Sequence, residues 1–310
     1  MINIYRTDDN NLYELSEIVP DSWINLVAPT EEELVYIMEE LNVEKDFLYA
    51  AMDEEERSRV EIENGQTLIL VDTPVIEPDG DSFTYSTLPV AIIMTKENLI
   101  TVSLQDFPLL KYYTELKKIT FTTKKRNRFV LQILYRNATL YLSYLKLIDK
   151  TSNKIQLELH KSMKNKEIIE MLQLENSLVY FSTSLKGNEL VLERLLRMSF
   201  IKAYPDDEDL LEDVIIENKQ AIEMCHIYMD ILKVTMDAFA SVISNNINNV
   251  MKLLTSITII LTIPTLVASL WGMNVNMPFQ NHPYGFYIVV GISFTIAIIV
   301  ALFMSKRRIL

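Results

Sequence analysis

The chain has 310 residues, of which 49% are hydrophobic, and it carries a formal net charge of −13. An acidic protein of this kind is poorly suited to nucleic acid and better suited to attracting cations. Its single cysteine, Cys225, excludes an intrachain disulfide and suits a reducing compartment.

Residues 1–128 are predicted to form an α+β cytoplasmic domain. The first residues contain no apolar stretch, so a signal peptide is not expected. Proline and glycine are frequent up to residue 108, which is typical of a region with many turns. Thr30 and the three glutamates after it form a capping box for a helix that runs to Glu40. The segments with strand character are Trp23–Leu26, Thr67–Val75, Val90–Met94 and Leu99–Ser103, with a turn at Asp79-Gly80.

Long helices are predicted after this domain, because residues 109–263 hold one glycine and one proline, Gly187 and Pro205. Phe129 to Lys186 has the character of one or two helices, and we assign residues 129–205 to a helical hairpin. The basic stretch before it, Lys117 to Arg128, is interpreted as solvated surface near a helix start. The alternative is a basic patch near an acidic membrane face or the mouth of a pore.

One further helix is predicted over residues 206–271, a segment without an internal glycine. If continuous, it would be about 100 Å long, far longer than a globular helix. Its last part, about residues 252–271, is expected to cross a membrane, and the rest would form a stalk in the cytoplasm. Pro264 lies inside this span, where it is expected to bend the helix and free a carbonyl group.

Two apolar runs without a charge, Leu253–Trp271 and Phe286–Met304, each cover about 28 Å, which is one hydrocarbon core. We therefore predict a second span at residues 285–305, an outer loop at 272–284 and a cytoplasmic tail at 306–310. The basic residues that flank the spans are Lys252, Lys306, Arg307 and Arg308, and the loop has none. The positive-inside rule then predicts a multi-pass protein of the plasma membrane with both termini in the cytoplasm.

A polar stripe runs along the stalk and the first span. Its members recur at steps of three and four residues, which places them along one seam of a helix. Hydroxyl and amide groups gain nothing from facing hydrocarbon but can face a partner helix or water. The stripe therefore suggests a water-filled path lined by copies of this helix; alternatively, each threonine hydroxyl bonds the carbonyl group four residues earlier. The members are Asp237, Ser241, Ser244, Asn248, Met251, Thr255, Thr258, Thr262, Thr265 and Ser269.

Three short motifs stand out beside the predicted spans and strands. They are Gly272-Met273-Asn274 after the first span, Asn248-Asn249-Val250-Met251-Lys252 before it, and the early strand Trp23-Ile24-Asn25-Leu26. Together these motifs resemble the CorA magnesium transporter family. The resemblance is clear over residues 205–310 and fainter over 20–105. It implies a funnel-shaped homopentamer in which the long helix lines a pore for Mg²⁺, with Co²⁺ and Ni²⁺ as further cargo.

Mg²⁺ holds its water shell tightly and prefers oxygen ligands. A pore that conducts it does better with neutral acceptors, which bind the hydrated ion and release it again. Gly272 is expected to turn the backbone sharply, and Asn274 to offer an amide oxygen to an outer ring of five. The structural alternative for Gly272-Met273-Asn274 is an ordinary helix end followed by a loop.

At the inner end, Asn248 is the stronger lumen candidate because an amide reaches further than a hydroxyl. Met251 and Leu254 would form an apolar collar that gates by dewetting, or they only pack the helix. Asp237 is the one carboxylate on the stripe. A ring of five such groups would concentrate cations at the inner exit, unless Asp237 is only solvated.

An acidic run over residues 206–213 begins the stalk. Acids at a helix start are favoured by the helix dipole. Asp209, Asp213 and Glu217, however, stack like charges on one face, which is destabilising without a counter-ion. The resemblance places Asp213 at the regulatory acid of the family, where cytoplasmic Mg²⁺ is a regulatory ligand shared with a Glu-Asp pair of a neighbouring subunit.

Two features depart from the family pattern. Ala50-Ala51 stand where that Glu-Asp pair is expected, and Asp53 slightly downstream is the nearest candidate to replace it. The predicted outer loop carries no acid, so attraction of cations there is absent or falls to its amides. These amides are Asn276, Gln280 and Asn281. His282 in the same loop would suit a softer metal, although a lone loop histidine is usually polar surface.

The leading interpretation is a pentameric channel for hydrated Mg²⁺, not an enzyme, that is closed by cytoplasmic Mg²⁺. The membrane potential would supply about 4.6 kcal/mol for a divalent ion at ~100 mV. One alternative is the zinc-transporting branch of the superfamily, against which Met273 argues. The other is a membrane-tethered adaptor or enzyme. A tether needs no polar stripe, and the sequence has no Walker loop, nucleophile elbow or cluster of His and Cys.

Overall fold

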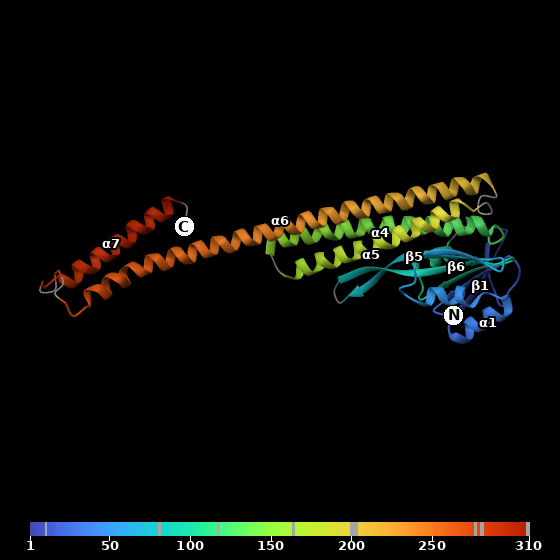
Figure 1. The fold of residues 1–310 in the computed structure, drawn as a ribbon, viewed down its shortest axis with the longest axis horizontal. Coiled ribbons are helices and arrows are strands. Elements are labelled where there is room, and N and C mark those ends of the chain that lie inside the picture. Colours follow the sequence, from blue (N-terminus) through green and yellow to red (C-terminus); the bar gives the residue numbers. More distant parts are fainter. Residues whose placement is uncertain are drawn as a thin grey trace. The chain divides into compact units, whose positions relative to one another are not determined.

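The computed structural model describes residues 1–9, 11–79, 82–116, 118–162, 165–198, 204–275, 278–279 and 282–307. The chain divides into two compact units, Met1–Val234 and Thr235–Leu310. Figure 1 shows the helices and strands of both. The division falls inside the longest helix, so one element contributes to both units.

Within the described part of the first unit, seven strands form one mixed sheet in the order β2-β1-β3-β7-β6-β5-β4. β3 and β7 pair in parallel, and the other neighbours pair antiparallel. The strands are β1 (Ile2–Asp8), β2 (Asn11–Leu15), β3 (Trp23–Val27), β4 (Arg59–Glu63), β5 (Gln66–Asp79), β6 (Ser82–Met94) and β7 (Leu99–Ser103).

Helices cover both faces of this sheet (Figure 1). On one face α1, α2 and the 3-10 helix η1 bury an apolar cluster that includes Ile37, Phe47 and Ile100. On the other face α4 and α5 pack against the sheet. There the ring centroids of Trp23 on β3 and Phe129 on α4 lie 5.3 Å apart. β3 and β7 are buried on both sides because they lie between these layers. The helices are α1 (Glu31–Leu41), α2 (Lys45–Tyr49), η1 (Ala50–Met52), α3 (Pro108–Thr114), α4 (Arg126–Ser162), α5 (Asn165–Leu196), α6 (Pro205–Trp271) and α7 (Gly285–Lys306).

The predicted capping box is confirmed at the start of α1. Thr30 Oγ1 accepts a hydrogen bond from the Glu33 N–H at 3.3 Å, and the Glu33 carboxylate accepts one from the Thr30 N–H at 2.8 Å. The helix ends at Leu41, one residue beyond the prediction, where Asn42 adopts a left-handed conformation with φ of 47°. Asparagine tolerates this conformation better than most residues, which explains the stop.

A polar cluster joins the sheet to α4 and α5. The buried Asn188 side chain on α5 donates to the Asp72 carbonyl at 2.8 Å and accepts from the Asp72 N–H at 2.9 Å and from Ser58 Oγ at 3.2 Å. Asn137 on α4 donates to the same carbonyl at 2.8 Å. Burial raises the pKa of the Asp72 carboxyl group, which hydrogen bonds from Ser184 and Ser58 partly offset. Such a network fixes how the helices sit on the sheet.

The first part of α6 packs along α5. Asn218 on α6 donates to the Leu185 carbonyl at 3.1 Å, and the Cys225 thiol donates to the Leu178 carbonyl at 3.1 Å. Both α6 side chains are buried. The α/β region and the helical hairpin, which we predicted as 1–128 and 129–205, therefore lie in one compact unit, and α4 already begins at Arg126.

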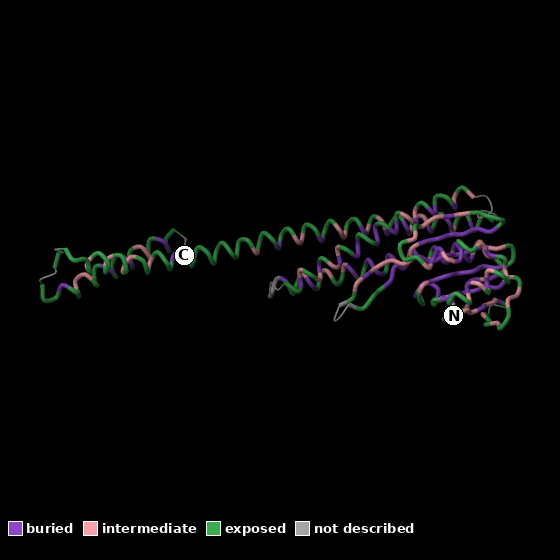
Figure 2. The backbone as a smooth tube through the Cα atoms, turned by 60° about the horizontal axis from the view of Figure 1, so that its bottom comes forward, coloured by how far each residue is buried: buried purple, intermediate pink, exposed green. Residues whose placement is uncertain are grey.

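The second unit consists of the rest of α6, α7 and the described residues between them. By length and composition, both helices are able to cross a membrane. In the most apolar 18-residue stretch of each helix, only 6% and 11% of the residues are buried. The first unit, by contrast, has a continuous buried core (Figure 2). The buried side chains of the second unit include the small residues Ser256, Ser293 and Ala297. Small residues are typical of helix contacts within membranes.

Candidate functional site

The polar stripe of α6 lies away from α7. Val267 lines a cavity together with Val290 and Ser293 of α7, which marks the side of α6 that faces α7. Ser256, which is fully buried, and Ile260 and Ile263, which are half-buried, lie on the same side at helical spacing. The stripe from Thr255 to Ser269 lies roughly half a turn away from that side, at ~100° per residue. Most side chains of this part of α6 are exposed, so exposure alone does not distinguish the stripe from the rest of the helix. The stripe is distinguished by its position, because α7 covers the opposite side of α6 and leaves the whole stripe open to other copies or to water.

Three threonines of the stripe bond their own helix. The hydroxyl groups of Thr258, Thr262 and Thr265 donate to the carbonyl groups four residues earlier, at 2.8, 2.7 and 3.0 Å. The alternative in which a threonine hydroxyl bonds the carbonyl group four residues earlier therefore holds for Thr258, Thr262 and Thr265. Since the proton of each hydroxyl is used inside the helix, its oxygen remains available only as an acceptor.

The inner members of the stripe are exposed as well. Asp237, Ser241, Ser244 and Asn248 lie on the α6 surface. Two apolar members of the predicted collar also project outward, with Met251 54% and Leu254 57% exposed. Apolar side chains this open on a single chain are expected to contact lipid or other copies.

The Gly272-Met273-Asn274 motif begins as the last turn of α6. The Gly272 N–H donates to the Ala268 carbonyl at 2.9 Å, and the Met273 N–H donates to the Leu270 carbonyl at 3.3 Å. The chain turns at Gly272 and bends over Met273, Asn274 and Val275, and Gly272 does this without a left-handed conformation. Met273 and Asn274 are exposed beyond the helix end.

The acids at the start of α6 divide into two groups. Asp206 and Asp207 pair with Arg128 at 3.5 and 3.6 Å. Burial raises the pKa of Asp207, which Arg128 partly offsets. These two acids therefore have a structural partner in the predicted basic stretch, which the sequence did not reveal. The other group, Asp209, Asp213 and Glu217, lies further along α6, where Asp209 and Asp213 are exposed.

The acids that were predicted to be regulatory do not belong to any group of three metal ligands among the described residues. Asp53 is exposed, and its carboxylate accepts from the Glu55 N–H at 3.0 Å. Ala50 and Ala51 are buried in the core, where they have no ligand to offer. Among the residues that the structure describes, no three His, Cys, Asp or Glu side chains are placed to hold a metal ion. A regulatory site at Asp213 would need groups from another copy.

The outer loop is described only in part. Asn276, Gln280 and Asn281 lie outside the described residues. His282 is exposed, and its Nδ1 accepts a hydrogen bond from the Tyr284 N–H at 3.2 Å. One ring nitrogen is thus engaged in the loop itself, which favours the polar-surface interpretation of His282.

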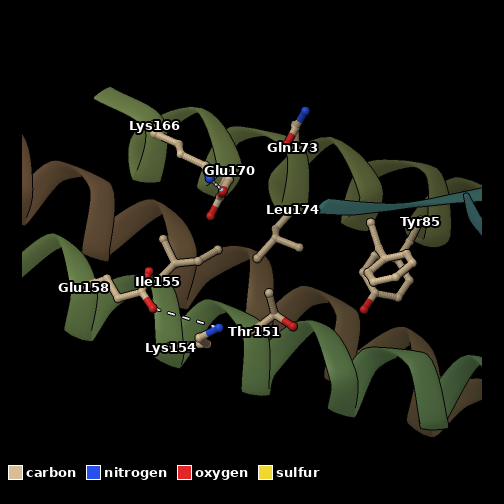
Figure 3. Close-up of a pocket in the computed structure, with 10 residues that line it drawn as sticks. Tyr85, Thr151, Lys154, Ile155, Glu158, Lys166, Glu170, Gln173 and Leu174 are labelled. Carbon is tan, nitrogen blue, oxygen red and sulfur yellow. Dashed lines mark ion pairs between the residues drawn. The ribbon is translucent and has the colours of Figure 1, made fainter. Parts of the chain in front are cut away.

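A cavity of about 390 Å³ lies in the first unit, between the far ends of α4 and α5 and the β5–β6 hairpin (Figure 3). Its charged groups are paired on their own helices, Lys154 with Glu158 at 3.9 Å and Lys166 with Glu170 at 3.7 Å. Each carboxylate there has a lysine beside it, so the cavity has no excess of negative charge for a cation.

An α/β unit continuous with a long helix, followed by apolar helices with an open polar stripe, is the arrangement that we expected of a membrane ion transporter. Residues 22–307 match a family model described as a CorA-like Mg²⁺ transporter protein. The chain belongs to this family, and it is therefore an ion transporter and not an enzyme.

Curated relatives share most of their length with this chain. The cobalt/magnesium transport protein CorA of Methanocaldococcus jannaschii is 28% identical over 291 residues, which cover 89% of this chain and 87% of the relative. The cobalt/magnesium transport protein CorA of Thermotoga maritima is 23% identical, with 97% and 87% covered. The magnesium transport protein CorA of Campylobacter jejuni is 24% identical, with 99% of both covered.

Solved structures show the same fold. The complete structure of the CorA magnesium transporter from Methanocaldococcus jannaschii has a TM-score of 0.86 at 24% identity and covers 99% of this chain and 98% of its own. The ZntB cytoplasmic domain from Vibrio parahaemolyticus has a TM-score of 0.62 at 10% identity, with 78% and 98% covered. The predicted fold, a mixed α/β domain with a long helix and a C-terminal apolar helix, is confirmed.

Proposed function

We propose that the protein is a homopentameric channel that conducts hydrated Mg²⁺, with Co²⁺ and Ni²⁺ as further cargo, into the cytoplasm. The membrane potential drives the ion, and cytoplasmic Mg²⁺ closes the path. The observation that carries the proposal is the polar stripe of α6, which stays open on the side opposite α7. In a ring of copies, α6 would line the axis and α7 would lie outside it.

The proposed orientation places the first unit and both termini in the cytoplasm. Lys252 stands before the apolar part of α6, and Lys306 and Arg307 end or follow α7. The stalk, about 206–251, would lead into spans at about 252–271 and 285–305, with residues 272–284 outside. This arrangement agrees with the positive-inside rule.

The threonine hydroxyls suit a hydrated cation. Thr258, Thr262 and Thr265 use their protons inside the helix. Their oxygens would accept hydrogen bonds from the water shell of Mg²⁺, whose water protons point outward. A lumen of acceptors offers little to an anion, which needs donors. Thr255 and Ser269 would extend this lining toward both ends.

The two ends of the path would have different roles. Five copies of Asn274 after Gly272 and Met273 would form an outer ring that binds the hydrated ion first. At the inner end, Asn248 would form a second amide ring, and Met251 and Leu254 an apolar collar that closes by dewetting. Further inward, Ser244, Ser241 and Asp237 would lead the ion out.

Closure would depend on contacts between copies. Since no described set of three ligands forms within one chain, Mg²⁺ at Asp213 would have to bridge two subunits, with Asp53 as the candidate partner and Asp209 and Glu217 beside it. Binding would stabilise the packed, closed assembly, and loss of Mg²⁺ would shift the population toward open stalks.

Flux into proteoliposomes tests this function. The protein is reconstituted with a Mg²⁺-sensitive dye inside, and a K⁺ gradient with valinomycin sets the interior negative. We expect saturable uptake of Mg²⁺ that increases with the potential. Absence of uptake by assembled protein would contradict the proposal, and competition in which Zn²⁺ is preferred over Mg²⁺ would favour the zinc-transporting alternative.

A further inference from the structure

The loop that carries Asn274 is held to both helix ends by contacts outside the motif itself. The first contact comes from Trp271, the last residue of α6, whose indole Nε1–H donates to the Pro278 carbonyl at 3.3 Å. The indole also lines an apolar cavity of about 320 Å³ with Pro264 and Phe286. The ring is thus anchored in the α6–α7 contact, while its N–H reaches across the loop.

The second contact lies at the start of α7. Phe279, next to Pro278, has a left-handed backbone with φ of 68°. A Cβ added to Gly285 would overlap the Phe279 carbonyl oxygen. That carbonyl also accepts from the His282 N–H at 3.1 Å, and the Gly285 N–H donates to the His282 carbonyl at 2.8 Å. Only glycine at position 285 lets the loop backbone approach α7 this closely.

Together the contacts fix the returning segment, Pro278-Phe279, at both sides. Trp271 ties it to the end of α6, and Gly285 admits it to the start of α7. Gly272-Met273-Asn274 lies between Trp271 and Pro278 in the sequence. The hydrogen bond between Trp271 and Pro278 therefore closes a short loop of the chain that contains the motif. A short closed loop has far fewer conformations than an open one, which reduces the entropy lost when the loop binds an ion.

We propose that Trp271 and Gly285 are positioning residues for the outer ion site: they hold Asn274 in the geometry that first captures the hydrated cation. The inference rests on the proposed function, in which Asn274 forms the outer ring. Neither residue touches the ion. Their loss should therefore weaken capture at low ion concentration and leave the conducting α6 stripe unchanged.

Two matched pairs of variants test the proposal in the full-length protein. Trp271→Phe keeps a ring in the apolar cavity but removes the donor. Trp23→Phe makes the same change in the first unit, where the indole donates to Thr101 Oγ1 at 2.9 Å. Gly285→Ala introduces the overlap with Phe279, whereas Gly291→Ala makes the same change on α7 with no atom within 4 Å of the new Cβ.

The readouts are KM and maximal rate of Mg²⁺ uptake, and block by external cobalt(III) hexaammine. This complex is inert and octahedral, and it donates hydrogen bonds outward as hydrated Mg²⁺ does. We expect Trp271→Phe to raise KM and the blocking concentration at least about fivefold, the value of one neutral hydrogen bond, with the maximal rate unchanged. Gly285→Ala should raise both further, and Trp23→Phe and Gly291→Ala should change neither.

The results that would contradict the positioning role differ from those that would contradict the outer ring. If Trp271→Phe and Gly285→Ala assemble but retain the KM and block of the parent, or lower only the maximal rate, the positioning role is contradicted. If one of them fails to assemble by gel filtration, the other pair decides. Asn274→Ala is measured beside them. Normal uptake by Asn274→Ala would refute the outer ring itself, whereas lost uptake with an unaffected Trp271→Phe would refute the positioning role alone.

Discussion

The two units of this chain differ in how far they bury their apolar side chains. In the first unit Ile92, Phe181 and Leu185 are fully buried between sheet and helices, so water itself drives their packing. In the second unit Leu261 is 64% and Leu302 66% exposed. The first unit therefore has a hydrophobic core of its own, whereas the second unit leaves most of its apolar side chains exposed, as helices that lie in lipid do. Stability and conduction should therefore respond to different substitutions.

The largest expected effect separates the units by stability. Phe181 packs edge-on against Tyr85 and Tyr141. Phe181→Ala should lower the free energy of unfolding by about 3–5 kcal/mol, because it leaves a cavity in a core that cannot fully collapse. Leu261→Ala, on the exposed side of α6, should change it by less than about 0.5 kcal/mol. Thermal unfolding of the full chain in detergent measures both, and equal losses would break the comparison.

Conduction should show the reverse pattern. Asn274→Ala removes the amide from every copy of the proposed outer ring, so we expect Mg²⁺ uptake to fall to that of protein-free liposomes while the melting temperature stays unchanged. Asn249→Ala is the control, since Asn249 is also an exposed amide but lies off the stripe. Uptake by Asn274→Ala that equals the parent's would remove Asn274 from the path.

Inhibition by internal Mg²⁺ tests whether the first unit controls the second. Asp213→Asn removes one proposed bridging carboxylate. The internal Mg²⁺ concentration that halves the flux should then increase about tenfold, within the usual range of coupling between sites. Glu212→Gln is the control, because Glu212 is also exposed but lies on another side of α6. If both variants are inhibited as the parent is, Asp213 has no part in closure.

The smallest effect concerns the polar cluster of the first unit. Burial raises the pKa of Asp72, so the folded state binds its proton more tightly than the unfolded state does. Stability should therefore be greatest below the unfolded-state pKa and fall as the pH rises through the folded-state pKa. Asp72→Asn should flatten this decline. Melting temperatures of both proteins between about pH 4 and about pH 7 give the comparison, and parallel curves would contradict it.

The sequence predicted the central strands β3 and β7 but missed about half of the hairpin that β5 and β6 form. β3 and β7 are short apolar runs and were identified, whereas β5 continues past Val75 to Asp79 and β6 begins at Ser82, well before Val90. Pro78 and Pro89 lie in these missed stretches, and Pro74 lies near the end of the strand that was predicted. They are tolerated because those stretches have a sheet neighbour on one side only among the described residues. This arrangement depends on strand pairing, which periodicity does not reveal.

The candidate site was predictable in outline only. Spacing alone gave the α6 stripe, since a helical seam follows from sequence. Its placement opposite α7 depends on how two helices pack, and the pairing of Arg128 with Asp207 joins elements about 80 residues apart. The contact of Trp271 with Pro278 and the approach of Phe279 to Gly285 depend on loop geometry. No sequence pattern pointed to either.

The central claim is that the stripe surrounds a wet axis, and cysteine accessibility tests it most directly. Cys225 is buried, and burial raises the pKa of its thiol to about 12, so the parent should not react. Single cysteines are placed along α6 in reconstituted protein and treated with a water-soluble methanethiosulfonate during Mg²⁺ uptake. The stripe positions are 255, 258, 262, 265 and 269, and the positions facing α7 are 256, 260, 263 and 267. We predict rapid block at the first set and none at the second. Block at the α7-facing set, or no reaction along the stripe, would contradict the account.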